Sequence, residues 1–387
     1  MLVLFPEGSR RRRNRRGLGG ARSRRDGPAA MSWSRLQRNR PRSNSQERRK
    51  AAAVLLTMLL LAGCGGTASR ASPTPSTLSG HGPVATSSTT KSSSVPATST
   101  TTVPPTIVPP VNSIGSFRVT TTTVYVADTT RPTVSYGHLV ASSRTLTTVV
   151  WYPPAGSGPY PLIVFAHGFQ VGLTPYQRIC QEWASAGYVV AAPEFPLTDE
   201  AVAGPYLDEH DMVNQPRDVS FVISSILARS ASVKASPLRH LIRSNDVAVA
   251  GHSDGADTAL DIGYLPYDRD QRVRAILSDA PDPLPGISTS SPLHSATPLL
   301  LIHGTADTIA PFEGSLTVTE QLKTPGWFVQ LLEANHLPPI EGPSRWTTLF
   351  DTVTTDFFNT ELKAASRRKL AAAVDRSPVG HLVVLPT

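Results

Sequence analysis

The chain of 387 residues is long enough for one large domain or two ordinary ones, and its 40% hydrophobic content supports a buried core without disulfide bonds. Two cysteines exclude a disulfide-rich scaffold. The net charge of +8 is uneven, because residues 1–63 hold 16 of the 37 Lys and Arg but 3 of the 29 Asp and Glu, leaving 21 basic and 26 acidic residues beyond them. The positive charge therefore belongs to an amino-terminal segment, and we expect no nucleic-acid partner.

Residues 51–62 form a short apolar run, AAAVLLTMLLLA, which three basic residues at 48–50 precede. The run is too short to span a bilayer as a stable helix. A basic region, a short apolar stretch and small residues at its end are the requirements of a secretory signal peptide. We therefore expect residues 1–63 to be a signal segment, with translation starting at Met31 rather than Met1.

The apolar run ends in Leu61-Ala62-Gly63-Cys64, which resembles a bacterial lipobox. The resemblance implies that Cys64 becomes the acylated first residue of a protein held at the outer face of the cytoplasmic membrane or in the cell envelope. The alternative is an ordinary signal peptide followed by an incidental cysteine. Cys180 is then the remaining thiol, and its helical context indicates a buried structural role.

Residues 64–113 are almost wholly Ser, Thr, Pro, Gly and Ala. This composition cannot build a core and predicts an extended, disordered tether. The final residues, 363–387, show no clear pattern, and we expect a weakly ordered tail.

Residues 114–362 alternate short β-rich runs with helical patterns, which is typical of an α/β sheet. The predicted strands are 117–126, 145–152, 161–167, 188–193, 246–252, 273–279, 298–304 and 327–333. The predicted helices are 175–186, 215–228, 254–263, 312–322 and 344–362. We expect a mostly parallel eight-stranded sheet with helices on both faces and no large lid domain, since about twenty residues separate the sixth and seventh strands.

Gly251-His252-Ser253-Asp254-Gly255 fits the pattern G-x-S-x-G, with a predicted strand before it and a predicted helix after it. This context predicts a nucleophile elbow that presents the hydroxyl of Ser253 at a helix amino terminus. A serine hydroxyl needs a base to take its proton and a carboxylate to orient that base. Asp307 and His336 follow the seventh and eighth predicted strands, where an open α/β sheet gathers its ligands.

These segments resemble the α/β-hydrolase superfamily, over residues 114 to about 362. HGTADTIAP and ANHLPP are similar to the acid and histidine segments of cutinase-like polyester hydrolases, while AHGF and AAPEFP are similar to chlorophyllases, within a group that includes dienelactone hydrolases. The resemblance implies Asp307 as the acid and His336 as the base. Asp254 departs from the pattern, because polyester hydrolases usually have methionine there, and we expect its carboxylate to point away from the nucleophile.

Two backbone N–H groups should form the oxyanion hole, one from Asp254 after the nucleophile and one from Phe169 after the third predicted strand. Alternative acids and bases stay open: Asp279 and Asp282 are the rival acids, and His167, His252 and His303 are rival bases whose places at strand ends favour loop support. Neither a metal-ligand spacing nor a dinucleotide motif is present, so we expect no metal and no cofactor.

The sequence therefore predicts an exported, lipid-anchored serine hydrolase that cleaves carboxylic esters through an acyl-enzyme intermediate. The acidic connection at 194–216 disfavours anionic substrates unless its acids are paired, so we expect a neutral ester, small or polymeric, and a monomeric enzyme. An amidase, peptidase or thioesterase with the same triad, and a non-catalytic binding module on the same scaffold, are the alternatives.

Overall fold

The structure is a computed structural model that describes residues 115–154, 156–283, 296–321, 325–338, 340 and 342–385, together with the backbone of 106–108. The predicted signal segment, Met31, Cys64 and most of the predicted tether lie outside these ranges. No helix within the ranges combines the length and apolar character that a membrane crossing needs.

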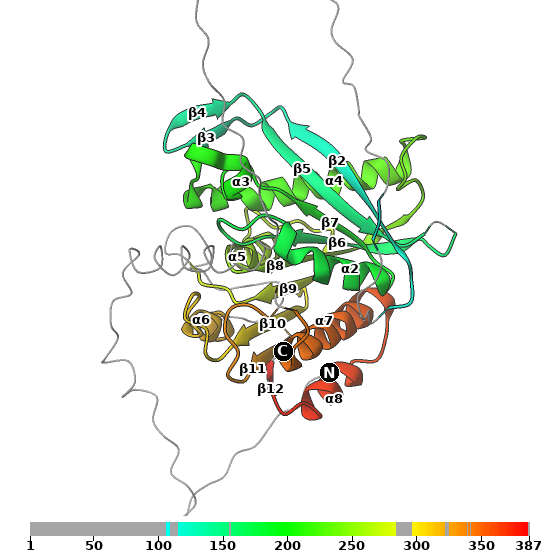
Figure 1. Ribbon diagram of the computed structural model, residues 1–387, viewed down its shortest axis with the longest axis vertical. Helices are drawn as coiled ribbons and strands as arrows, with labels where there is room; N and C mark the ends of the chain where they lie inside the picture. The colour runs from blue at the N-terminus through cyan, green and yellow to red at the C-terminus, as the bar shows by residue number, and fades with distance from the viewer. Residues whose placement is uncertain are drawn as a thin grey trace, which may run out of the picture. The chain divides into compact units, whose positions relative to one another are not determined.

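A ten-stranded sheet forms the centre of the described residues, with a separate two-stranded hairpin beside it (Figure 1). The sheet strands are β1 (Thr106–Val108), β2 (Val119–Asp128), β5 (Arg144–Tyr152), β6 (Tyr160–Ala166), β7 (Val189–Pro193), β8 (Ile242–His252), β9 (Val273–Asp279), β10 (Leu299–Gly304), β11 (Gly326–Leu331) and β12 (Gly380–Leu385). Their spatial order is β1-β2-β5-β7-β6-β8-β9-β10-β11-β12. The pairings between β7 and β11 are parallel, and those toward both edges are antiparallel.

The central strands are buried on both faces, which explains their nearly continuous apolar runs. In β6, Leu162 and Val164 pack into one hydrophobic cluster, while Ile163 and Phe165 pack into the other. Side chains alternate between the faces of a strand, so each face of the sheet receives half of the run. The sheet is therefore the middle layer of three.

Helices cover both faces of the sheet, as Figure 1 lets the reader follow. The first cluster includes side chains of α4 (Gln215–Ala231), α5 (Asp254–Tyr264) and α6 (Glu313–Gln321). The second includes side chains of α2 (Gln177–Ser185), α7 (Arg345–Lys363) and α8 (Arg368–Asp375). Shorter elements are α3 (Glu200–Ala203) and the 3-10 turns η2 (Thr174–Tyr176), η3 (Gly204–Tyr206) and η4 (Glu209–Asn214).

All eight predicted strands and all five predicted helices have counterparts, so the α/β prediction is confirmed. The sheet has two more strands than expected, β1 and β12. β1 lies inside the predicted tether and pairs antiparallel with β2. Outside this sheet, β3 (Thr133–Ser135) and β4 (His138–Ala141) form a small hairpin. Between β9 and β10, the segment 284–295 lies outside the described residues.

The prediction of a weakly ordered tail after residue 362 is wrong for residues 363–385. Leu370 and Val374 of α8 are 2% exposed and belong to the same cluster as α7, and β12 pairs with β11 along its whole length. Four residues separate Leu370 from Val374, so they share one helix face, and burying this face orders the segment. The domain therefore extends at least to Leu385.

The carboxyl ends of β6, β8, β10 and β11 meet at one edge of the sheet, because these strands run parallel. The loops that follow them carry Phe169, Ser253, Asp307 and His336. An open α/β sheet binds its ligands at this edge.

Candidate active site

Ser253 sits on a sharp turn between β8 and α5. Its backbone angles, φ 58° and ψ −129°, lie in a region that residues other than glycine rarely adopt. A Cβ on Gly251 would lie 1.8 Å from the carbonyl oxygen of Gly255, and a Cβ on Gly255 would lie 2.2 Å from the carbonyl oxygen of Ala166. Glycine is therefore required on both sides of Ser253, as a strained nucleophile elbow demands.

The loop after β6 lies directly against this turn. A Cβ built on Gly168 would be 3.1 Å from the Cβ of Ser253. The next residue, Phe169, is half-buried, and Asp254 is the first residue of α5. Gly168, which precedes Phe169, thus lies against Ser253, and Asp254 follows Ser253 directly.

His336 and Asp307 form the shortest polar contact of the site. His336 Nδ1 donates to Asp307 Oδ2 at 2.6 Å, and both side chains are buried. Asp307 Oδ1 accepts the backbone N–H groups of Ile309 at 2.8 Å and Ala310 at 3.0 Å. The carboxylate is thus fixed at both oxygens, in the turn that follows β10.

A second histidine also reaches Asp307, since His303 Nε2 lies 3.3 Å from Asp307 Oδ2. Burial raises the pKa of Asp307, but the hydrogen bonds and charges of His303 and His336 outweigh burial and hold the pKa well below its ordinary value of 3.8. Asp307 is therefore ionised at neutral pH. An ionised carboxylate on His336 Nδ1 fixes the tautomer that leaves Nε2 free to accept a proton.

The sequence profile of the family described as Chlorophyllase matches residues 109–303, just over half of the chain. The chain belongs to the chlorophyllase family. The matched region includes β8, Ser253 and the helices α2 to α5, and it ends before Asp307 and His336. No curated protein matches the sequence.

A solved structure shares the fold of this chlorophyllase-family chain. The ferulic acid esterase from Streptomyces cinnamoneus superposes with a TM-score of 0.54 at 17% sequence identity, over 72% of this chain and 99% of the esterase. The fold is that of the α/β-hydrolases, and the chain is an ester-hydrolysing enzyme.

The rival bases in the chlorophyllase-family chain use both ring nitrogens in contacts with loops. His167 bonds the carbonyl oxygen of Gly168 at 2.8 Å and accepts the N–H of Phe195 at 3.1 Å. His303 bonds Ser315 Oγ at 2.7 Å and the carbonyl oxygen of Ala310 at 3.0 Å. These two histidines hold loops together, as their places at strand ends predicted.

The rival acids do not contact His336 in the way Asp307 does. The nearest histidine nitrogen to Asp279 is Nε2 of His252, 4.0 Å from Asp279 Oδ2, and that oxygen has no hydrogen-bond partner. Burial, helped by the charge of Asp307, raises the pKa of Asp279 well above 3.8. The backbone N–H of Asp282 donates to Asp257 Oδ2 at 3.2 Å. Asp279 is thus a buried carboxyl that ionises less readily than an ordinary aspartate, which suits a triad acid poorly.

Asp254 interacts electrostatically with Asp257, three residues further along α5. Burial first, and then the charges of Asp254 and Asp261, raise the pKa of Asp257 well above 3.8. Residues three apart are neighbours on a helix surface, so the interaction between Asp254 and Asp257 follows from the helix itself.

Acidic side chains of the connection after β7 make structural contacts. Arg144 on β5 is 1% exposed and binds two carboxylates, Asp211 at 2.7 Å and Asp218 at 2.5 Å. Asp199 and Asp208 accept backbone N–H groups at the starts of α3 and η4. No group of three or more His, Cys, Asp or Glu side chains in the described ranges can hold a metal ion. The sequence alone did not reveal Arg144 as the partner of these acids.

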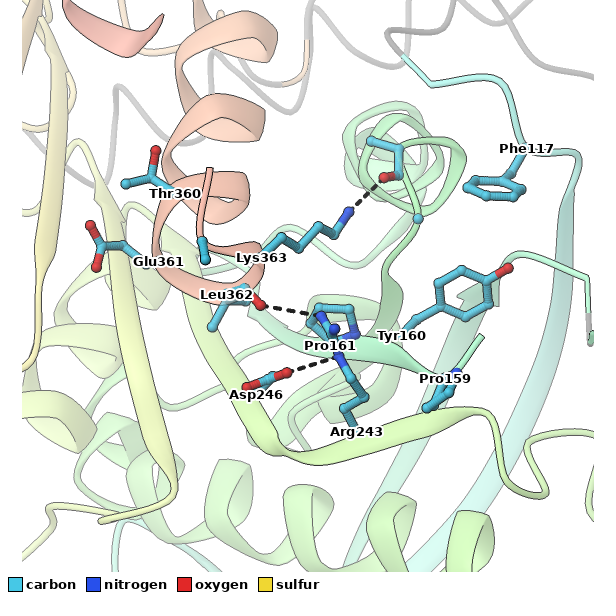
Figure 2. Close-up of a pocket in the computed structure, with 13 residues that line it drawn as sticks. Phe117, Pro159, Tyr160, Pro161, Arg243, Asp246, Thr360, Glu361, Leu362 and Lys363 are labelled. Atoms are coloured by element: carbon cyan, nitrogen blue, oxygen red, sulfur yellow. Dashed lines mark hydrogen bonds and ion pairs between the residues drawn. The ribbon is translucent and has the colours of Figure 1, made fainter. Parts of the chain in front are cut away.

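A pocket of about 660 Å³ opens at the opposite, amino-terminal ends of the strands (Figure 2). The rings of Phe117 and Tyr160 lie on one side of it, and Glu361 lies on the other. Its two cations already bond helix ends: Lys363 Nζ donates to the carbonyl oxygen of Ala186 at 2.8 Å, and Arg243 donates to that of Leu362 at 3.2 Å. The pocket lies apart from Ser253.

Proposed function

We propose that the chain is a serine carboxylesterase in which Ser253 is the nucleophile, His336 the general base and Asp307 the orienting acid. The observation that carries the proposal is the 2.6 Å contact between His336 and an ionised Asp307, in a loop at the same sheet edge as the strained turn of Ser253. A serine at such a turn is an activated nucleophile only when a neutral imidazole can take its proton.

The reaction then follows from these positions. His336 Nε2 takes the proton of Ser253 as Oγ attacks the ester carbonyl carbon, and the imidazolium that forms is stabilised by Asp307. The negative charge of the tetrahedral intermediate falls between the N–H groups of Phe169 and Asp254, and each such donor contributes about 3 kcal/mol to transition-state stabilisation. His336 returns the proton to the leaving alcohol, and water then resolves the acyl-enzyme by the reverse sequence.

We expect a neutral ester, small or polymeric, as the substrate. Buried Arg144 takes up the charge of Asp211 and Asp218, while the connection after β7 also carries Glu194 and Glu200. Their net negative charge disfavours an anionic substrate. The enzyme is expected to act as a monomer.

The proposal is tested with p-nitrophenyl esters of short and medium acyl length. The wild-type chain is expected to release a burst of about one product per enzyme, and Ser253→Ala and His336→Ala are expected to lose both burst and turnover. Turnover that survives in Ser253→Ala contradicts the proposal. Matched ester and amide substrates with one acyl group separate an esterase from an amidase, because they differ in the leaving group alone.

Export and lipid anchoring at Cys64 are a separate part of the proposal. The lipobox-like sequence before Cys64 supports it. Metabolic labelling with an alkyne fatty acid in a bacterial host is expected to mark the wild-type chain at the membrane and to leave Cys64→Ala unlabelled. Equal labelling of both chains, or a soluble wild-type chain, contradicts the anchor.

A further inference from the structure

A series of buried, hydrogen-bonded polar groups next to Ser253 connects three loops of the site. The backbone N–H of Gly168 donates to the hydroxyl of Tyr176 at 3.3 Å, and that hydroxyl lies 2.8 Å from His252 Nδ1. On the other side of the ring, His252 Nε2 lies 2.9 Å from the carbonyl oxygen of His336. Tyr176 is 1% exposed, His252 2% and His336 4%.

The groups at the two ends of this hydrogen-bonded series fix the direction of its outer bonds, and a neutral His252 ring fixes the direction of the middle one. The amide of Gly168 can donate only, so the oxygen of Tyr176 accepts there and its hydrogen is free for His252 Nδ1. The carbonyl of His336 can accept only, so His252 Nε2 carries the ring hydrogen. When the ring of His252 is neutral, these contacts therefore hold it as the Nε2–H tautomer.

The surroundings of His252 favour the same neutral form. Burial and the nearby His336 lower the pKa of His252 well below 6.5, against smaller opposing effects of the His336 carbonyl and Asp307. Asp279 Oδ2 lies 4.0 Å from His252 Nε2, and burial raises the pKa of that carboxyl well above its ordinary value. The ring of His252 also packs on those of His336 and Tyr176, with centroids 4.4 Å and 5.6 Å away.

This hydrogen-bonded series touches the backbone at three places next to groups of the proposed mechanism. Gly168 precedes Phe169, whose N–H is a proposed oxyanion donor, and His252 precedes Ser253. The third place is the backbone carbonyl of His336, the proposed base. A displacement of about 1 Å in such a constellation can cost about 100-fold in rate.

We propose that Tyr176 and His252 are positioning residues that hold the oxyanion loop, the nucleophile turn and the backbone of the base in register. The inference rests on the proposed roles of Ser253 and His336. Neither side chain touches the substrate, and both act through the groups they bond.

The first test is Tyr176→Phe, which removes one hydroxyl and keeps the packed ring. Tyr188→Phe is the matched control, because Tyr188 is also buried and loses a single 2.8 Å bond, to Asn359 at the other end of the sheet. We expect Tyr176→Phe to lower kcat and the burst rate on the order of 10- to 100-fold with KM changed less than about twofold, and Tyr188→Phe to keep kcat. Equal kcat in the two variants overturns the proposal.

The second test does not require activity. In the full chain labelled with ¹⁵N-histidine, the ring nitrogens of His252, assigned by the loss of signals in His252→Gln, are expected to show the Nε2–H tautomer unchanged between pH 5.5 and 8.5. A ring that titrates in this range, or that carries its hydrogen on Nδ1, overturns the proposal. If wild-type turnover instead survives Ser253→Ala, the proposed function fails while this spectrum is unaffected, so the two failures are distinguishable.

Discussion

Replacing Asp307 by asparagine tests the acid of the proposed triad. The two N–H groups of Ile309 and Ala310 point at Oδ1, so the amide oxygen of asparagine must take that place. Its NH₂ group then faces Nδ1 of His336 across the contact that measures 2.6 Å with aspartate. Two donors cannot share that contact, and His336 must place its hydrogen on Nε2, where it can no longer accept the proton of Ser253.

The expected loss is large. The same exchange in a serine protease triad lowers kcat about 10⁴-fold, which corresponds to about 5 kcal/mol of barrier. The assay is kcat for a p-nitrophenyl ester together with the single-turnover acylation rate. The control is Asp351→Asn. Asp351 is a buried carboxylate on α7 that pairs with Arg178 at 2.6 Å, and removing its charge is expected to keep kcat.

A tenth or more of wild-type kcat in Asp307→Asn would refute the reasoning, and inactivity of Asp279→Asn would then identify the rival acid. The same variant tests the lowered pKa of Asp307 in a different way. Because the folded-state pKa lies below 3.8, ionised Asp307 stabilises the fold above that pH, and this contribution is lost as pH falls through the folded pKa. The difference in unfolding free energy between wild type and variant should therefore shrink in acid.

Three further predictions concern stability and are read from urea or thermal unfolding. Arg144→Ala leaves buried Asp211 without its cation and buried Asp218 with Arg131 alone, and it should cost about 3–5 kcal/mol. Arg272→Ala, whose side chain is 35% exposed, should cost under about 1 kcal/mol, and similar losses in the two variants would contradict this. Truncation after Lys363 removes α8 and β12 and should lower Tm and abolish ester turnover, so an unchanged Tm would count against it. Gly255→Ala should prevent folding or activity, while Gly342→Ala, with nothing within 4 Å of the new Cβ, should behave as wild type.

The strands were predictable where one run of sequence contained the whole signal. Residues 161–167 read as a strand because residues 162–166 are all apolar, and β6 occupies Tyr160–Ala166 with all residues buried. The elbow was predictable for a similar reason, since two glycines, a preceding strand and a following helix all lie within one segment. The catalytic roles of Ser253, Asp307 and His336 stay predictions.

The edges of the fold were not predictable, because their order depends on distant partners. β12 reads as a short run, HLVVL, after an isolated turn of helix, and it becomes a strand by pairing with β11. β1 has three residues within a Ser, Thr and Pro-rich segment, and its partners on β2 lie more than ten residues away.

The supporting polar contacts were hidden for the same reason. Tyr176 and His252 are 76 residues apart, and Arg144 and Asp218 are 74 apart. Nothing near Tyr176 in the sequence marks its hydroxyl as the partner of a histidine. His303 was visible as a strand-end histidine, but its approach to Asp307 needed the geometry of the turn.

The bond between Leu332 and Val379 has a consequence for how the enzyme is made. The N–H of Leu332, at the start of the loop that carries His336, donates to the carbonyl oxygen of Val379 at 2.8 Å, just before β12. During synthesis the ribosome therefore releases Ser253, Asp307 and His336 well before the segment that holds the loop of the base. Contacts so distant in sequence form late and slowly. We therefore expect the loop that carries His336 to reach its final position only after β12 has paired with β11.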